Sequence, residues 1–338
     1  GGELRAGRLQ LHGVDIADPT DRFRFDAIEG DIRFSADATA LPGSLAWAGG
    51  ALYGLAFGAA ALPLESSDGM LRLRDAATVP MLGGTLELAH FALRPPGGDD
   101  GLLVRFGLAV EGMDIGQLSE AVGWPAFRGT LSGVIPEARY ADDRLEFDGD
   151  LVMDLFEGTV RASGLAMERP FGSAPTLTAD LRMDDIDLLS LTEVLDFGSI
   201  SGRLDGRIEG LRLVDWQPVA FDARLLTDRT RGVPQRISQR AVQNISSVGD
   251  ASFANSLQGR LIALFDDFGY SQIGISCRLR NEVCEMGGLR SGSNTFTIVS
   301  GAGLPRLTVV GHNRHVDWPV LVERLAAVAG GDVKPVFD

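Results

Sequence analysis

The sequence predicts a mainly β protein, with an elongated, repetitive antiparallel sheet that curves into an apolar groove. Apolar and polar residues alternate along much of the chain, as in strands with one buried face and one wet face. A short segment also recurs at a fixed spacing, which is typical of repeat architectures. The 338 residues are 45% hydrophobic and 23% charged, a composition that allows the chain to bury a core.

The recurring segment fits the pattern D-x-x-x-L-x-E-x-[VL]. Its three copies begin at Asp114, Asp187 and Asp317. A second pattern, G-x-L-x-G-x-I, follows the first two copies at the same offset, at Gly129 and Gly202. An internal period of this kind predicts structural units that pack against their neighbours.

A further pair of related segments, GGTLELAHFALRPP and EGTVRASGLAMERP, extends the repeat. We therefore expect a β-rich partial repeat, two full repeats, and a C-terminal cap region with two helices, a β-hairpin and a terminal helix. Their expected bounds are 1–80, 81–153, 154–232 and 233–338.

Each copy of the aspartate motif predicts a short helix. The aspartate side chain can accept a hydrogen bond from an orphan amide in the first turn, as N-cap residues do. Pro319 lies in the first turn of the third copy, where proline is tolerated. The Leu and the final Val or Leu are four residues apart and share one helix face. We interpret the Asp and Glu as capping and solvated residues, because no chemistry in the sequence supports a catalytic carboxylate pair.

Charge and motifs argue against several function classes. The net charge of −15 disfavours nucleic acid as a partner. His312 and His315 form the only histidine cluster, without the spacing of a metal site. Ser291 and Ser293 lack a nucleophile elbow. We expect no enzymatic activity, no metal and no cofactor.

One uncharged stretch, residues 38–64, invites comparison with a membrane span. Pro42 and Pro63 bracket this stretch, and small residues dominate it. Large and small residues also alternate from Tyr53 to Gly58, with a period of two. We prefer strands here over a transmembrane helix.

The two cysteines, Cys277 and Cys284, flank a predicted hairpin turn. A turn centred on Arg280-Asn281 would place them opposite each other, because Asn tolerates the left-handed backbone of tight turns. We expect a disulfide, which persists only in an oxidising compartment. The alternative is two reduced, half-buried cysteines.

Residues 234–268 interrupt the β pattern. Ile237, Ala241 and Ile245 fall at helical spacing, and a second stripe runs from Phe253 to Phe268. A helical pair packed on the sheet is the simplest interpretation. The pair could instead plug or line an apolar groove, or touch a membrane surface.

Four segments show the β alternation most clearly: 102–112, 144–154, 176–184 and 201–210. In each of them apolar side chains face one way and charged side chains face the other. An apolar face left uncovered would be a costly exposed patch unless it binds something apolar.

The strand–[DN]-[IV]-D–helix pattern followed by G-x-L-x-G-x-I resembles the repeat of the AsmA-like superfamily of Gram-negative envelope proteins. The stretch from AVQNISSVG to DWPVLVERL resembles the C-terminal region of such a protein. The resemblance implies that the chain is the C-terminal periplasmic part of a larger protein anchored in the inner membrane. It also implies a β groove that carries phospholipid acyl chains towards the outer membrane.

Alternation alone maps the lipid-binding lining of that groove onto this sequence. The expected residues are Val104, Phe106, Leu108, Leu145, Phe147, Leu151, Met153, Leu177, Leu181, Leu204 and Ile208.

Two other functions compete with the lipid conduit. An envelope assembly scaffold would pair its strand edges with an outer-membrane protein or lipoprotein. A β-solenoid enzyme or polysaccharide-binding module would need paired carboxylates and exposed aromatic residues. Only 7% of the residues are aromatic, which disfavours the last function.

Overall fold

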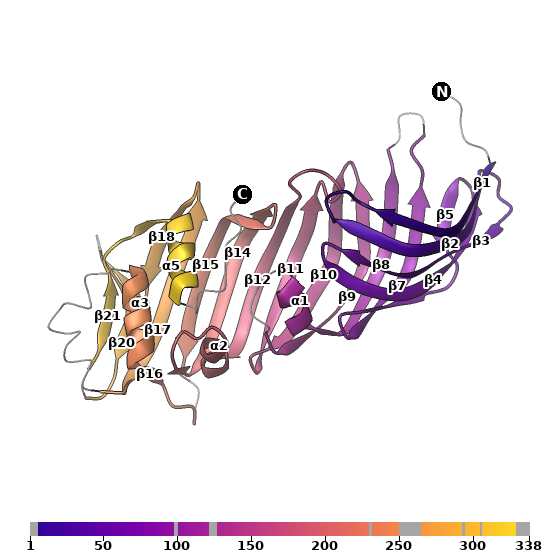
Figure 1. Ribbon diagram of the computed structural model, residues 1–338. Coiled ribbons are helices and arrows are strands. Elements are labelled where there is room, and N and C mark those ends of the chain that lie inside the picture. The colour runs from indigo at the N-terminus through magenta and orange to yellow at the C-terminus, as the bar shows by residue number, and fades with distance from the viewer. Residues whose placement is uncertain are drawn as a thin grey trace. The chain divides into compact units, whose positions relative to one another are not determined.

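The computed structural model describes residues 6–97, 101–121, 127–229, 232–249, 265–292, 295–304 and 306–328. Those residues contain 22 strands and four helices. Figure 1 labels most of these elements. The strand pairs are antiparallel, from the first hairpin to the last. The predicted class, a mainly β chain with repeated antiparallel strands and few short helices, is confirmed.

Contacts between residues divide the chain into two compact units. The N-terminal unit comprises Gly1–Val122, Arg128–Met153 and Ala162–Thr178. The C-terminal unit comprises Gly123–Phe127, Asp154–Arg161 and Ala179–Asp338. The division falls within three strands, β10 (Arg144–Leu155), β11 (Gly158–Glu168) and β12 (Thr176–Asp187).

Strands of the N-terminal unit pair mostly with their neighbours in sequence. β1 pairs with β2, β2 with β3 and β3 with β4. The short strands β5 and β6 both pair with β4 and with β7, after which β7, β8 and β9 continue the pairing. Helix α1 (Ile115–Ala121) follows β8. The strands are β1 (Ala6–Ala17), β2 (Phe23–Ser35), β3 (Leu41–Leu52), β4 (Leu55–Ser67), β5 (Met70–Leu73), β6 (Ala77–Met81), β7 (Gly84–Arg94), β8 (Leu103–Asp114) and β9 (Gly129–Ala141).

The uncharged stretch 38–64 forms the hairpin β3–β4, as the alternation predicted. Tyr53 and Gly54 make its tight turn, with φ of 50° and 80°, the left-handed pair that such turns require. The rings of Phe25 on β2, Trp47 on β3 and Phe57 on β4 pack together, with centroids 5.2 to 6.1 Å apart. Apolar residues that resemble a span in the sequence are therefore strand residues here.

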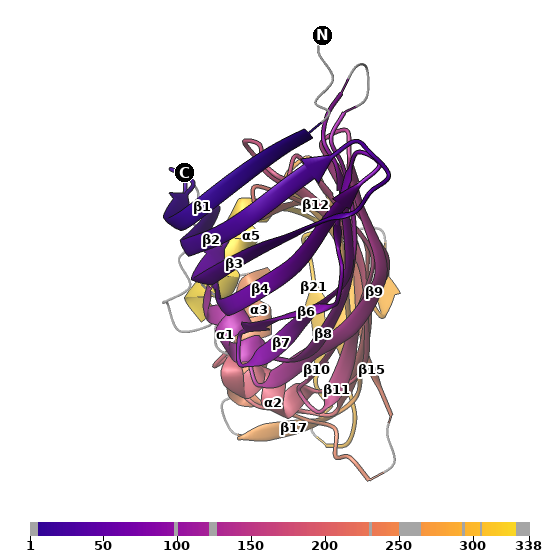
Figure 2. The ribbon, with the colours of Figure 1, turned by 90° about the vertical axis from the view of Figure 1, so that its right-hand side faces the viewer.

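Two turns of the N-terminal strands contact the loop between β11 and β12. Figure 2 shows β1–β4 side by side in this unit. The Tyr53 hydroxyl donates to the Pro170 carbonyl. The Arg22 guanidinium donates to the carbonyls of Phe171 and Gly172, the latter at 2.9 Å. Asp18 orients Arg22 through a 2.7 Å ion pair. We call these contacts the loop clasp.

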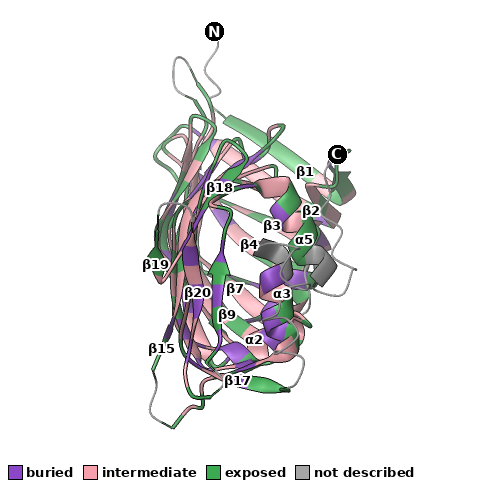
Figure 3. Ribbon diagram, turned by 90° about the vertical axis from the view of Figure 1, so that its left-hand side faces the viewer, coloured by how far each residue is buried: buried purple, intermediate pink, exposed green. Residues whose placement is uncertain are grey.

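In the C-terminal unit, α2, α3 and α5 lie on one side of the strands (Figure 3). β14, β15, β17 and β18 pair in that order, β17 also pairs with β20, and β20 with β21. Helices α2 (Leu188–Val194), α3 (Gln239–Gly249) and α5 (Trp318–Val328) follow strands. The strands are β13 (Ile200–Ser201), β14 (Arg203–Val214), β15 (Gln217–Asp228), β16 (Arg236–Ser238), β17 (Asp267–Arg280), β18 (Val283–Gly288), β19 (Arg290–Ser291), β20 (Phe296–Gly301), β21 (Thr308–Gly311) and β22 (His315–Asp317).

All three motif aspartates cap helices, as the sequence predicted. Each is the last residue of a strand, and each Oδ1 accepts the backbone N–H three residues later. The bonds are Gln117 N to Asp114 at 3.1 Å, Ser190 N to Asp187 at 2.9 Å and Val320 N to Asp317 at 3.1 Å.

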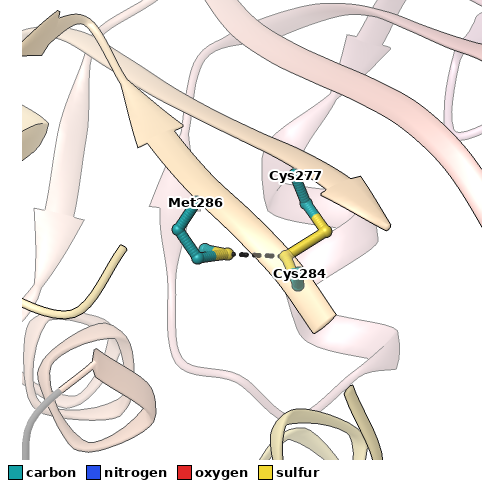
Figure 4. The surroundings of a disulfide bond; sticks show 3 residues. All are labelled: Cys277, Cys284 and Met286. Atoms are coloured by element: carbon teal, nitrogen blue, oxygen red, sulfur yellow. Dashed lines mark hydrogen bonds between the residues drawn. A yellow bond between two sulfur atoms is a disulfide. The ribbon is translucent and has the colours of Figure 1, made fainter. Parts of the chain in front are cut away.

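The predicted cysteine hairpin is β17–β18, and Cys277 and Cys284 form a disulfide (Figure 4). Two details of the prediction are corrected. The turn is centred on Asn281-Glu282, both with positive φ, one residue beyond the predicted centre. The cysteines are diagonal neighbours on one face instead of direct partners, because Cys277 pairs with Met286 and Cys284 with Leu279.

The predicted helical pair is confirmed for its first helix, which is α3. Ile237 and Phe268, assigned to helices, lie instead in β16 and β17, where they are partners. Pairing buries both side chains, and this tertiary context overrides the helical spacing. The rest of the second predicted helix lies outside the described residues.

Candidate functional site

An apolar cavity of about 290 Å³ lies in the C-terminal unit, between the strands and the helices α2, α3 and α5. Among the described residues, no charged side chain lines it. Its lining consists of Leu188, Leu191, Thr192, Leu195, Phe197, Ile200, Leu204, Leu225, Thr227, Ile245, Ile273, Ile275, Met286, Phe296, Ile298, Gly311, Asn313, Val316, Leu321 and Leu325.

Strand alternation builds the floor of the cavity. Leu225 and Thr227 on β15 are two residues apart, and Ile273 and Ile275 on β17 follow the same rule. Leu225 and Ile275 are direct cross-strand partners. The residues that alternate with these lining residues along β15 and β17 point to the other face of the sheet. There Arg278 and Asp222 form a 2.9 Å ion pair. One face of this sheet is therefore apolar, and the other face carries this ion pair.

The aspartate motif builds the roof. The motif Leu and the final Leu lie on one helix face in both α2 and α5, and all four side chains line the cavity: Leu191, Leu195, Leu321 and Leu325. Helix α3 adds Ile245. The caps therefore fix where two apolar helix faces begin, and both faces turn towards the same space.

The polar side chains of the lining, Thr192, Thr227 and Asn313, each make a hydrogen bond within the protein. The Thr192 hydroxyl donates to the Leu188 carbonyl at 2.7 Å. The Thr227 hydroxyl oxygen accepts from the Ile273 amide at 2.8 Å. Asn313 Oδ1 accepts from the His315 amide at 3.3 Å. A ligand gains little by offering these groups a hydrogen bond, so the lining favours hydrocarbon.

Polar contacts hold α3 beside the end of α2. Arg240 forms a bidentate pair with Asp196, at 2.8 and 2.7 Å, and this hydrogen bonding lowers the pKa of the Asp196 carboxyl. The Asn244 amide donates to the Phe197 carbonyl at 2.8 Å. Such contacts restrict how far α3 can move from the cavity.

Helix α5 is held at its first residue. The Trp318 amide donates to the Glu282 carbonyl at 2.8 Å, and its indole packs edge-on against Phe221, with centroids 5.3 Å apart. The preceding strand, β22, pairs with β18 next to Cys284. The Cys284 sulfur lies 3.0 Å from the Met286 sulfur, and Met286 lines the cavity. The disulfide therefore contacts one lining residue, Met286 (Figure 4).

Of the eleven residues expected to bind lipid, Leu204 lines this cavity. The other ten lie on β8, β10, β12 and β14 and are half-buried, neither enclosed nor fully exposed. Their contact with a ligand stays a prediction. The helix residues of the lining were not assigned to the site from the sequence, although the shared helix face of the motif was the signal for them.

Apolar rows cross three strands of the N-terminal unit. Each predicted residue of β8 lies between partners on β7 and β9. The rows are Leu93–Val104–Tyr140, Phe91–Phe106–Ala138 and Leu88–Leu108–Ile135.

Other features of the C-terminal unit carry less chemistry. A hollow of about 640 Å³ beside β16 and β17 mixes Arg229 and Gln235 with glycine and alanine, so it favours no one ligand class. Within the described ranges, no group of three or more His, Cys, Asp or Glu side chains could hold a metal ion. The helices of those ranges include none long and apolar enough to cross a membrane.

No known protein family, curated protein or solved structure matches this chain.

Proposed function

We propose that this protein is a periplasmic lipid-transfer conduit, which carries phospholipid acyl chains on an apolar β surface between the inner and outer membranes. The observation that carries the proposal is the cavity between the sheet and the helices α2, α3 and α5, whose described lining is mainly hydrocarbon and includes no charged side chain. A lining of this kind suits an acyl chain and suits a polar or charged ligand poorly.

The half-buried apolar face of the strands supports the same function. Hydrophobic attraction has no preferred direction, and each buried methylene contributes about 0.8 kcal/mol. A chain can therefore shift along an apolar face and keep most of its stabilisation. The disulfide supports a periplasmic location, because disulfides persist in oxidising compartments.

The test is native mass spectrometry of the purified protein, combined with solvent extraction and lipid analysis. We expect phospholipid to co-purify, and we expect Phe106→Asp and Phe147→Asp to lower the amount that is bound along the strands, because a half-buried carboxylate opposes hydrocarbon. Val134→Asp is the matched control, since Val134 is 60% exposed. A wild-type protein that neither contains nor takes up phospholipid would refute the conduit.

The circular dichroism spectrum decides how the two substitutions act. If Phe106→Asp or Phe147→Asp unfolds the protein, that phenylalanine is an ordinary core residue and is no longer assigned to the lipid-binding residues.

A second function, an envelope assembly scaffold, is favoured by β1. In the described part of the chain β1 pairs with β2 alone, and Leu9 and Ile16 on it are 53% and 42% exposed. Such an edge could accept a strand of an outer-membrane protein or lipoprotein. Photo-crosslinkers at Gln10 would label that partner in cells. Lipid crosslinks without any protein crosslink would count against the scaffold.

A further inference from the structure

We propose that the cavity of the C-terminal unit holds a single hydrocarbon chain of limited length and excludes the second chain of a two-chain lipid. This inference rests on the proposed function, and it specifies what the conduit holds in this unit. The head group stays outside, because the described residues of the lining include no charged side chain to bind it.

The volume sets the length. An apolar cavity of roughly 150 Å³ accepts benzene, which has six carbon atoms. On the same scale, about 290 Å³ accommodates roughly a dozen carbons. That is the content of one acyl chain or most of one. Two chains of a membrane phospholipid contain more than twice as many carbons.

The exposure of the lining residues indicates where the cavity opens to solvent. Most lining residues are buried or half-buried, but Asn313 and Leu325 are exposed. Asn313 precedes β22, and Leu325 lies on α5. The proposal therefore places the opening of the cavity between this loop and this helix, where an entering chain would leave its head group in water.

The walls resist widening. The Arg240–Asp196 pair and the Asn244 amide hold α3, and the Trp318 contacts hold α5. The floor is a paired sheet. A second chain would have to break these contacts, so the helices limit the bore to one chain.

The experiment measures binding of alkyl maltosides with chains of 8 to 16 carbons, below their micelle-forming concentrations, by calorimetry. Each added methylene should tighten binding roughly fourfold while it enters the cavity. We expect this gain to stop near a dozen carbons. Dilauroylphosphatidylcholine should bind with about the same affinity as its one-chain lysolipid.

Two substitutions in the floor shorten the cavity. Leu225→Phe and Ile275→Phe each add carbon atoms to a half-buried side chain that lines the cavity. We expect the chain length at which affinity stops rising, here called the break, to become roughly three carbons shorter. Leu226→Phe, on the same strand with its side chain on the other face, is the control and should leave the break unchanged. Thermal unfolding checks that all three variants fold.

Three results would overturn the inference. Affinity could keep rising through 16 carbons, the two-chain lipid could bind much more tightly than the lysolipid, or both substitutions could leave the break unchanged. If the protein still co-purifies with phospholipid in that case, the conduit stands and only the single-chain site is lost. If neither phospholipid nor any alkyl maltoside binds, both proposals fail together.

Discussion

Asp187 accepts a hydrogen bond from the Ser190 amide at 2.9 Å, and the helix that it starts directs Leu191 and Leu195 into the cavity. We expect Asp187→Ala to lower the free energy of unfolding by about 1 kcal/mol, because one orphan amide loses its partner. Urea denaturation measures the change.

Asp187→Asn should keep most of this stability, since Asn caps helices as well as Asp does. Glu193→Ala, an exposed residue of the same motif, is the control and should change stability by less than about 0.5 kcal/mol. An equal loss from Glu193→Ala would show that the cap is not the cause.

The Cys277–Cys284 disulfide closes a short loop, with a sequence separation of 7. Replacing both cysteines by alanine should lower the free energy of unfolding by about 2 kcal/mol, because the unfolded chain regains the freedom of that loop. Denaturation with and without a reducing agent tests this. The reductant should destabilise the native protein and leave the double variant unchanged.

Tyr270 is 2% exposed, and burial raises the pKa of its hydroxyl. Its hydroxyl donates to the Ser201 carbonyl at 2.7 Å. A raised pKa contributes stability that is complete below the unfolded pKa of about 10 and is lost as the pH rises above it. We therefore expect the free energy of unfolding to fall above about pH 10. Denaturation followed by circular dichroism measures this change.

Tyr270→Phe separates the two contributions. It should lower stability by about 1 kcal/mol at neutral pH, through the lost hydrogen bond, and should weaken the alkaline dependence. An unchanged alkaline dependence would assign that effect to other groups.

Hydrogen bonds lower the pKa of Asp31 to about 2, and the bond from Arg8 contributes more than the bond from Arg33. A lowered pKa contributes stability that is present above the unfolded value of about 4 and is lost as the pH falls towards 2. We expect the β1–β2 pairing to weaken in that window. Carboxyl resonances in NMR measure the titration, and Arg8→Ala should move the Asp31 pKa upwards.

Local patterns predicted most of the elements. Alternation gave the strands β8, β10, β12 and β14, and the motif aspartates gave the starts of α1, α2 and α5. Each of these signals lies within a dozen residues. Ile237 and Phe268 were missed as strand residues, because their pairing with each other, far apart in the sequence, decides their conformation. The hairpin turn was predicted one residue too early, and it is Asn281 and Glu282 that adopt the left-handed backbone.

The cavity could not be predicted as a whole. Leu225, Ile245 and Ile298 lie on separate elements, and only the pairing of β15, β17 and β20 and the placement of α3 bring them together. The helix face of Leu321 and Leu325 was visible in the sequence, but the strand residues that face it across the cavity could not be identified there. Alternation shows which way a side chain points and does not show what covers it.

The loop clasp also sets an order of events during synthesis. Tyr53 and its acceptor Pro170 are 117 residues apart in the chain, and Arg22 and Gly172 are 150 apart. At ribosomal rates of about 5 to 20 residues per second, Tyr53 waits roughly 6 to 23 seconds for its partner. The hairpins of β1–β4 pair locally and form early, but they remain unclasped throughout that interval. We therefore expect the strand edges to be open to association with other chains during this interval, before the clasp closes.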